Sequence, residues 1–541
     1  MLNQFWLDGR QRDGLRRRLV LFFLLTATAF AVVVGRLVFV FWLYEAPHNK
    51  ATGVPDISRG SIYDRGGYAL AVSLPAVSVY VHPYQVKDKL HVAQTLAALF
   101  PSKSAARWLK KLQSPRAFVW IKRHLTPRQH ERLLQANIAD LHIMDDEQRV
   151  YPQDSLVSHV VGFTDIDQRG LAGIERGLDE YLAQGEDVVL TLDMRFQGIM
   201  RAVLQDAVER YRPQGVTGVL LSAEDSDVMA MVSLPDFDAN HVGASPPQAR
   251  FHQAAHGVYE LGSLLKLFTV AHALEQGVDP YERRYDTKGT FFVDDLEVKD
   301  DHLDEGVLSL AQVLTYSSNI GSAQMALLSG MDAHLGFLRR FHFMESLPIV
   351  LRERGFPLYP SVWQRSDWVS TSYGYGLALS PLHLAAGVAA LVNGGLYRSP
   401  RFVHSMREQV VRPRYSVVSS HTSLLMRRLM RDAVLYGTGK AARDHSVSIG
   451  GKTGTAKQWH KGTYHSDRLV VSFVAAFPIE APVYVLLVVL DRPSFGGETA
   501  FNGVTGGDIA APLVKTLAQR FMALVPYGRD GSVEEVSDGT F

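Results

Sequence analysis

The most pronounced hydrophobic segment of the chain lies close to its N-terminus, at residues 19–44. Arg36 is its only charged residue, and as a helix it would span about 39 Å, enough to cross the hydrocarbon core of a bilayer. Five arginines precede it, so the positive-inside rule keeps the N-terminus in the cytoplasm and exports everything after residue 44. We therefore expect one uncleaved transmembrane helix.

Two other interpretations of this segment are weaker. A cleaved signal peptide would have a shorter apolar region followed by a small-x-small cleavage site, and neither feature is present. A buried core helix would not need the arginine cluster in front of it. Arg36 can either snorkel toward the outer interface or pair with a partner helix in the membrane, and both arrangements are compatible with the sequence.

Residues 45–211 mix short strand-like runs with polar helical stretches. The strand-like runs are 76–81 and 187–192, and the helical stretches lie around 127–137 and 171–182. Gly185 follows the second helical stretch as a stop signal. We expect an elongated, largely extended domain with few chemical features of its own.

From residue 215 the pattern changes to longer apolar elements. Two apolar runs, 216–222 and 228–233, are separated by a short polar stretch, which predicts a β-hairpin. Strands followed by helices and then by further strands predict an α+β domain with an antiparallel sheet. The later strands are expected at 469–477 and 483–491, and the helices at 263–276, 309–328, 381–392 and 507–524.

Length and composition limit the kind of protein that this can be. At 541 residues the chain has room for roughly two to four domains, and 47% hydrophobic residues can form large cores. Basic residues number 56 and acidic residues 55, so a net charge of +1 gives no electrostatic basis for nucleic-acid binding. The absence of cysteine excludes disulfides, thiolate zinc sites, iron–sulfur clusters and a cysteine nucleophile.

Ser263-Leu-Leu-Lys266 opens a predicted helix directly after a turn at 259–262. Residues three apart share a helix face, so the lysine can approach the serine hydroxyl at a helix N-terminus. A serine beside a neutral lysine is an activated nucleophile, and nearby cations and desolvation neutralise a lysine. Alone the pattern is weak, because S-x-x-K should occur by chance about once or twice in a chain of this length.

Two further short motifs follow. Ser317-Ser-Asn319 lies in a predicted helical region, where a helix cap or turn is its simpler interpretation. Lys452-Thr-Gly-Thr455 follows a strand-like run, and its lysine and two threonine hydroxyls on one strand would make a carboxylate site. Gly454 would let a substrate backbone approach the strand, although a β-turn with a solvated lysine is the alternative.

The order S-x-x-K, S-x-N, K-T-G is the signature of penicillin-recognising serine acyltransferases. The chain resembles class B penicillin-binding proteins, the monofunctional peptidoglycan D,D-transpeptidases, over roughly residues 16–525. Among them it is most similar to the division-specific septal type, with the elongation-specific type second. The other segments that carry this resemblance are 59–66, 69–72, 149–152, 159–163, 170–175, 189–193, 373–376 and 380–382.

The resemblance implies a role for each motif residue. Ser263 would attack the penultimate D-Ala carbonyl of a stem peptide with Lys266 as general base. Ser317, tuned by Lys452, would relay a proton to the leaving amine, and Asn319 would hold the substrate amide. The backbone N–H groups of Ser263 and Thr455 would form the oxyanion hole. The implied substrate-binding residues are Thr453, Gly454, Thr455, Tyr375 and Gly376.

The predicted fold class is α+β, with a single N-terminal transmembrane helix, an elongated mixed pedestal domain and a β-lactamase-like transpeptidase domain. The last of these would have an antiparallel sheet flanked by helices. Phe473, Phe477 and Tyr375 would either line its cleft or pack in its core. The expected boundaries are a cytoplasmic arm at 1–18, the transmembrane helix at 19–44, the pedestal at 45–211, the transpeptidase domain at 212–525 and a flexible tail at 526–541.

The resemblance also implies ligands, partners and location. The ligands are peptidoglycan stem peptides and β-lactam antibiotics, no cofactor is needed, and the 20 histidines form no metal-ligand pattern. A SEDS-family glycosyltransferase and other division membrane proteins would bind the transmembrane helix and the pedestal, for which a passive spacer is the alternative role. The catalytic domain would lie in the periplasm, anchored in the bacterial inner membrane.

Three other functions share some of these features. A membrane-anchored β-lactamase or D,D-carboxypeptidase has the same motifs, but the long pedestal favours transpeptidation. A β-lactam sensor would need more than a short cytoplasmic arm for signalling. A scaffold with a dead active site would not need every motif residue, and all of them are present.

Overall fold

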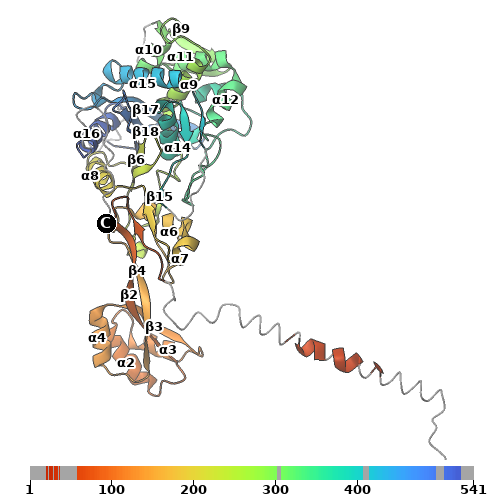
Figure 1. Ribbon diagram of the computed structural model, residues 1–541, viewed down its shortest axis with the longest axis vertical. Coiled ribbons are helices and arrows are strands. Elements are labelled where there is room, and N and C mark those ends of the chain that lie inside the picture. Colours follow the sequence, from red (N-terminus) through yellow and green to blue (C-terminus); the bar gives the residue numbers. More distant parts are fainter. Residues whose placement is uncertain are drawn as a thin grey trace, which may run out of the picture. The chain divides into compact units, whose positions relative to one another are not determined.

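The computed structural model describes residues 20–21, 24–28, 30–34, 36, 58–300, 306–405, 414–494 and 505–524 (Figure 1). The described chain forms two compact units, one containing residues 75–147 and the other residues 58–74 and 148 onward. Half of the residues of the predicted transmembrane segment, and all of the predicted tail, lie outside the described residues. Among the residues that are described, no helix has the length and apolar character needed to cross a membrane. The predicted domain boundaries remain predictions.

The smaller unit is a small sheet whose buried face is covered by helices. Val79 and Val81 of β2 alternate with residues of the opposite face and join Trp108 and Leu112 in one apolar core. The predicted strand 76–81 and the predicted helix near 127–137 are confirmed, and α2 and α3 are helices that the sequence analysis did not predict. Its elements are α2 (Lys89–Leu99), α3 (Ala105–Leu112), β3 (Val119–Leu125) and α4 (Pro127–Gln135), together with the parts of β2 (Ala69–Val81) and β4 (Leu141–Val150) that fall within residues 75–147.

The larger unit begins with a small sheet built from distant parts of the chain. Strand β5 pairs with β1 in parallel and with β15 in antiparallel orientation. Residues before 192 therefore share a sheet with a strand that starts at Val403. The elements of this region are β1 (Ile62–Tyr63), α5 (Ser158–Val161), α6 (Gly173–Gly177), α7 (Asp179–Ala183), β5 (Val188–Leu190) and β15 (Val403–Ser405).

A five-stranded antiparallel sheet forms the centre of the larger unit. Its order is β17-β18-β19-β6-β7, so β17 is an edge strand. In β19, Leu487 and Val489 enter one core, whereas Leu486 and Val488 enter the other, which explains the continuous apolar run in the sequence. The predicted hairpin and both later strands are confirmed. The strands are β6 (Gly215–Ser222), β7 (Val228–Leu234), β17 (Gly450–His460), β18 (Thr463–Phe477) and β19 (Tyr484–Asp491).

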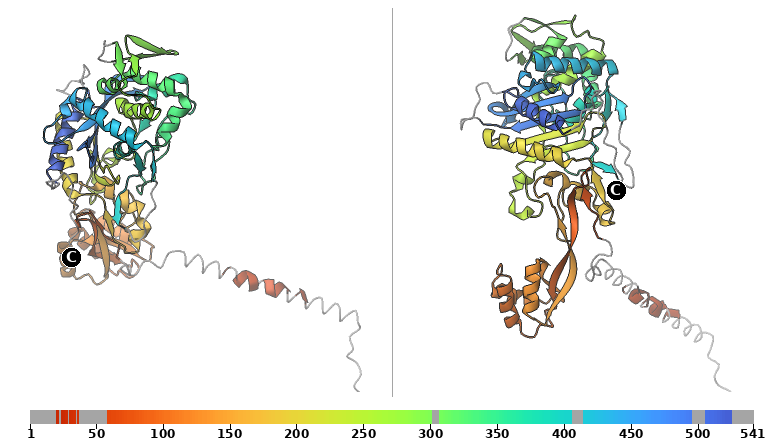
Figure 2. Two further views of the ribbon diagram at one scale, coloured as in Figure 1. Left: turned by 45° about the horizontal axis from the view of Figure 1, so that its top comes forward. Right: turned by 60° about the vertical axis from the view of Figure 1, so that its left-hand side comes forward.

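Helices cover both faces of this sheet. Helices α8 and α16 lie side by side on one face, and α14 packs on the other (Figures 1 and 2). Phe473 and Phe477 are fully buried in the core under α8 and α16, so they pack in the core and do not line a cleft. The principal helices are α8 (Met194–Tyr211), α9 (Lys266–Glu275), α14 (Pro381–Val392), α15 (Ser420–Leu435) and α16 (Ala510–Met522).

The helix predicted at 309–328 is interrupted in its middle. Helix α10 (Leu310–Tyr316) ends at Ser317, whose φ of 67° is left-handed, and Ser318 then caps α11 (Asn319–Ser329). A left-handed residue cannot continue a right-handed helix, so the prediction of one continuous helix was wrong. The first two residues of the S-x-N motif, Ser317 and Ser318, therefore lie outside both helices, and Asn319 begins α11.

Short elements surround these helices and the sheet. They are β8 (Tyr259–Glu260), η3 (Gly262–Leu265), β9 (Arg284–Asp286), β10 (Thr290–Val293), β11 (Leu296–Lys299), β12 (Val307–Ser309), α12 (Met331–Arg339), α13 (Arg365–Thr371), β13 (Ala378–Leu379), β14 (Leu396–Arg398) and β16 (Arg414–Ser416). The segment predicted as a turn before Ser263 contains β8, which pairs with β13. That pairing gives the turn bearing Ser263 a fixed support.

Candidate active site

Ser263 lies on a short helical turn that leans against the edge strand β17. The turn η3 precedes α9, and Ser263 is partly exposed while Gly262 and Leu264 beside it are buried. Gly262 has a φ of +55°, and a Cβ there would lie 2.5 Å from the carbonyl oxygen of Thr455. Only glycine allows this approach, so the sequence before Ser263 fixes the distance between the serine turn and β17.

Lys266 begins α9 one turn after Ser263 and is fully buried. Its Nζ atom donates hydrogen bonds to Asn319 Oδ1 at 2.7 Å and to Ser317 Oγ at 3.1 Å, and also to the carbonyl oxygen of Ser317. The left-handed turn at Ser317 directs both its carbonyl oxygen and its side chain toward this lysine. The first two motifs therefore meet at one amine.

The K-T-G motif lies on β17, as its strand-like context predicts. Gly454 is required there, because a Cβ would lie 2.3 Å from Ser472 Oγ and 2.5 Å from the carbonyl oxygen of Leu261. Thr453 Oγ1 shares a hydrogen bond of 2.8 Å with Thr438 Oγ1, and Thr455 Oγ1 accepts one from Gly506 N–H at 3.0 Å. The two threonine hydroxyls on this strand are thus oriented by neighbouring segments.

Lys452 brings the third motif to the same place. It is fully buried, and its Nζ atom donates to Ser317 Oγ at 3.0 Å and to the carbonyl oxygen of Thr453 at 3.1 Å. Burial, and then the charge of Lys266, hold the pKa of Lys452 well below its usual range. Ser317 Oγ accepts hydrogen bonds from two lysines, which uses both of its lone pairs and leaves its own proton available to a third group.

The lowered pKa of Lys452 predicts how stability depends on pH. Between the folded and the unfolded pKa values of this lysine the unfolded chain binds the extra proton, so wild-type stability rises as pH increases through that window. Lys452→Met removes the buried amine and should therefore be about 1–2 kcal/mol more stable than wild type at pH 7. The difference should shrink by pH 10.

Urea unfolding at both pH values tests this prediction. Lys288→Met, at an exposed lysine, is the matched control and should show no such dependence on pH. A wild type that is more stable than Lys452→Met at pH 7 would contradict the prediction, as would a difference that does not change with pH.

Asp300 and Thr438 belong to the site although no motif contains them. Asp300 accepts hydrogen bonds from Ser318 Oγ at 2.6 Å and from the backbone N–H of Asn319 at 2.5 Å, and so holds the start of α11. Thr438 contacts both Thr453 Oγ1 and the carbonyl oxygen of Thr315, at 2.8 and 3.3 Å. Both act across long sequence separations. In the sequence, Asp300 is marked only by its position at the end of a short strand, and Thr438 only by the glycines on either side of it. Neither signal is enough to predict a role in the site.

Tyr375 and Gly376 lie next to these motifs, on the loop after α13. The Tyr375 hydroxyl accepts a hydrogen bond from Lys457 N–H at 3.5 Å, and Gly376 N–H donates to Glu260 at 2.7 Å. The structure therefore brings Lys266, Ser317, Asn319, Lys452 and Thr453 into direct contact, and places the other candidates on adjoining segments. Asn319 also donates through Nδ2 to the carbonyl oxygen of Lys299 at 2.8 Å.

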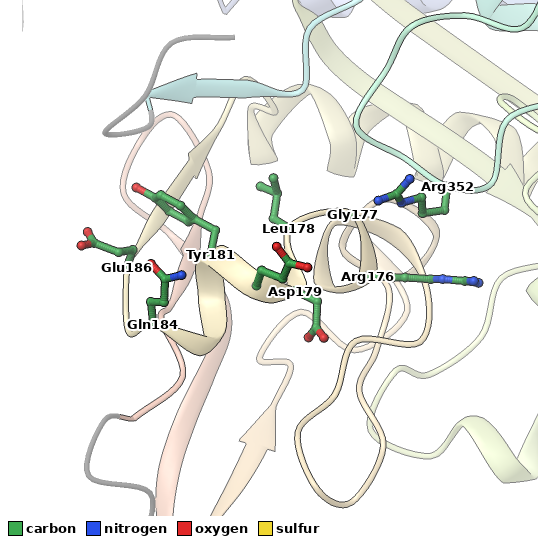
Figure 3. A pocket seen from close by; sticks show the side chains of 9 residues that line it. Arg176, Gly177, Leu178, Asp179, Tyr181, Gln184, Glu186 and Arg352 are labelled. Carbon is green, nitrogen blue, oxygen red and sulfur yellow. The ribbon is translucent and has the colours of Figure 1, made fainter.

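A separate pocket of about 650 Å³ lies on α6 and α7 and contains none of these residues (Figure 3). Charged and polar side chains line it, and Arg176 and Arg352 lie at one end of the view while Glu186 and Gln184 lie at the other. It brings together no serine, lysine or threonine of the motifs. The chemistry of the molecule is therefore placed at the edge of β17 and not in this pocket.

Two family models match the chain. The penicillin-binding protein transpeptidase domain matches residues 216–519, and the penicillin-binding protein dimerisation domain matches residues 56–191. The probable peptidoglycan D,D-transpeptidase FtsI of Caulobacter vibrioides is 33% identical over 478 residues, covering 86% of this chain and 80% of that protein. The peptidoglycan D,D-transpeptidase FtsI of Escherichia coli is 26% identical over 494 residues, covering 84% and 82%.

Solved structures show a similar fold. Penicillin-binding protein 3 of Mycobacterium tuberculosis, solved in complex with aztreonam, aligns with a TM-score of 0.69 at 24% identity, covering 89% of this chain and all of that one. Penicillin-binding protein 2X of Streptococcus thermophilus aligns with a TM-score of 0.70 at 18% identity, covering 87% and 80%. At these identities the likeness concerns the fold.

Proposed function

This chain belongs to the class B penicillin-binding proteins, and we propose that it cross-links peptidoglycan stem peptides through an acyl-enzyme on Ser263. The observation that carries the proposal is the convergence of two buried lysines on Ser317 Oγ, beside the turn that bears Ser263. The septal type is supported by the relatives named FtsI. The reaction is acyl transfer from a D-Ala-D-Ala peptide to an amine.

In the first step Ser263 Oγ attacks the carbonyl carbon of the penultimate D-Ala. Lys266, one helical turn away, takes the hydroxyl proton as general base in its neutral form, which keeps two N–H donors for Ser317 and Asn319 and one lone pair for Ser263. The carbonyl oxygen becomes an oxyanion between the backbone N–H groups of Ser263 and Thr455, and one such donor contributes about 3 kcal/mol in comparable enzymes. Gly262 allows the turn that bears Ser263 to pack closely against Thr455. This close packing supports the assignment of both backbone N–H groups to one oxyanion hole.

In the second half of this step the C–N bond to the terminal D-Ala breaks. The leaving amine needs a proton, and Ser317 supplies it because its lone pairs accept from Lys266 and Lys452 while its own hydrogen is free. A proton from the lysine pair then replaces it. The amine of a second stem peptide repeats the sequence in reverse and receives the acyl group, which releases Ser263.

The terminal carboxylate of the donor peptide binds at the start of β17. Lys452, Thr453 and Thr455 offer it an amine and two hydroxyls, and Thr438 orients the Thr453 hydroxyl. Because β17 is an edge strand, the peptide can add to it as a further antiparallel strand. Asn319 holds the peptide amide from the other side of the cleft.

We place the protein in the bacterial inner membrane, anchored by residues 19–44 with the catalytic unit outside the cytoplasm. The apolar run and the arginines before it support this topology. A SEDS-family glycosyltransferase and other division proteins are the proposed partners of the anchor and of the pedestal. A serine nucleophile, two lysines and backbone donors complete the proposed reaction without a cofactor.

Mass spectrometry of the intact protein with benzylpenicillin tests the acyl-enzyme. We expect an adduct of one drug mass that persists for hours and that peptide mapping assigns to Ser263. An adduct that hydrolyses within minutes would indicate a β-lactamase. No adduct, with the protein folded, would reject the proposed function and favour a scaffold.

A further inference from the structure

The carboxyl group of Glu260 joins three segments that border the proposed active site. Glu260 lies on β8, three residues before Ser263. Its Oε1 atom accepts hydrogen bonds from Gly376 N–H at 2.7 Å and from the Tyr464 hydroxyl at 3.0 Å. Gly376 belongs to the loop after α13, and Tyr464 lies at the start of β18, just after the turn from β17. The proposed mechanism makes no use of this carboxyl group.

Tyr375 is the side chain that these contacts hold in place. Its ring packs edge-on against Tyr464 with centroids 5.0 Å apart, and its hydroxyl accepts from Lys457 N–H at 3.5 Å. Lys457 follows Thr455 by two residues on β17, and alternate residues of a strand direct their N–H groups to the same side. The Tyr375 hydroxyl therefore occupies the edge of β17 one pairing position beyond Thr455.

The surroundings of Glu260 favour a firm contact over a mobile one. The carboxyl group lines a pocket of about 750 Å³ together with Trp459, Tyr464 and Arg468. Burial raises its pKa, and the hydrogen bonds from Gly376 and Tyr464 oppose that change. Hydrogen bonds to an ionised acceptor are roughly twice as strong as those between neutral groups, so the ionised carboxylate holds both donors more firmly than an amide would.

We propose that Glu260 is a positioning residue that fixes Tyr375 against β17 and so sets where a substrate peptide must leave that strand. This inference rests on the proposed acylation of Ser263 and names a determinant of its substrate. A peptide with several residues before D-Ala-D-Ala must pass Tyr375. 6-Aminopenicillanic acid, the penicillin nucleus without an acyl side chain, has no group that corresponds to those earlier residues and therefore serves as the short ligand.

The test compares these two ligands on the full chain. Tyr464→Phe removes one of the two donors, and Glu260→Gln keeps an acceptor oxygen but removes the charge. Both variants should raise KM about tenfold for a synthetic pentapeptide that carries a terminal D-thiolactate, with little change in kcat. Acylation by 6-aminopenicillanic acid should stay within about twofold of wild type. Tyr281→Phe and Glu209→Gln make the same changes at exposed positions and should alter neither reaction.

The comparison distinguishes a role of Glu260 in positioning the substrate peptide from a general structural role. An equal loss with both ligands would overturn the proposal, because it would make Glu260 a general support of the site. An unchanged KM for the pentapeptide would also overturn it. Tyr464→Phe leaves Glu260 in place, so it decides even if Glu260→Gln folds poorly. A folded wild type that neither ligand acylates would reject the proposed function itself, and this inference with it.

Discussion

Replacing Lys266 by methionine is expected to slow the acylation of Ser263 by benzylpenicillin by roughly 10³–10⁴-fold. Lys266 is fully buried, and its Nζ atom is held by Ser317 and Asn319. A thioether of similar length fills the space but cannot take the proton of Ser263. The loss should persist at every pH between 6 and 9, because no other described amine is placed one turn after the serine.

Mass spectrometry of reactions quenched at successive times, at several drug concentrations, measures the rate of acylation. Ser263→Ala should form no adduct and so gives the background level of the measurement. Lys288→Met, at an exposed lysine, controls for the lysine-to-methionine substitution itself. Thermal unfolding of Lys266→Met should show that the variant folds. A rate within tenfold of wild type, or one that recovers fully at pH 9, would show that Lys266 is not the base.

Much of the fold follows from the hydrophobic pattern. Strands β6 and β19 are buried on both faces, which makes them continuous apolar runs that are easily recognised. Two of the three motifs could also be placed on their elements, because S-x-x-K follows a turn at a helix start and K-T-G follows a strand-like run. Pairings between distant segments had no comparable signal. Strand β15 joins β5 across more than 200 residues, and such a pairing depends on tertiary packing.

The break at Ser317 shows why the site was harder to predict than the fold. Apolar residues continue at helical spacing on both sides of it, so the pattern predicts one helix. The left-handed turn is stabilised by partners far away in the sequence. Lys266 and Lys452 bind Ser317, and Asp300 holds Ser318. The cap interpretation of this motif is also correct, since Ser318 caps α11. Structural and chemical roles coincide in these three residues.

A second large effect is expected from Glu175, which is fully buried between two arginines. Its carboxylate accepts from Arg59 Nε at 2.8 Å and from Arg149 Nε at 2.7 Å. Replacing it by alanine leaves two buried guanidinium groups without this counter-charge. Breaking a buried pair by removing one partner costs about 3–5 kcal/mol, so Glu175→Ala should lower the free energy of unfolding by that amount. Urea unfolding measures the change.

Glu180→Ala is the matched control, because Glu180 is exposed on the neighbouring helix α7 and should change stability by less than about 0.5 kcal/mol. Arg59, Arg149 and Glu175 lie in the same compact unit as Ser263. Penicillin binding should therefore be lost at the urea concentration at which this network unfolds. Binding that survives the loss of the Glu175 contacts would mean that the network and the active site unfold independently. A loss below about 1 kcal/mol would mean that water or Asp179, which accepts from Arg59 at 2.8 Å, compensates the buried charges.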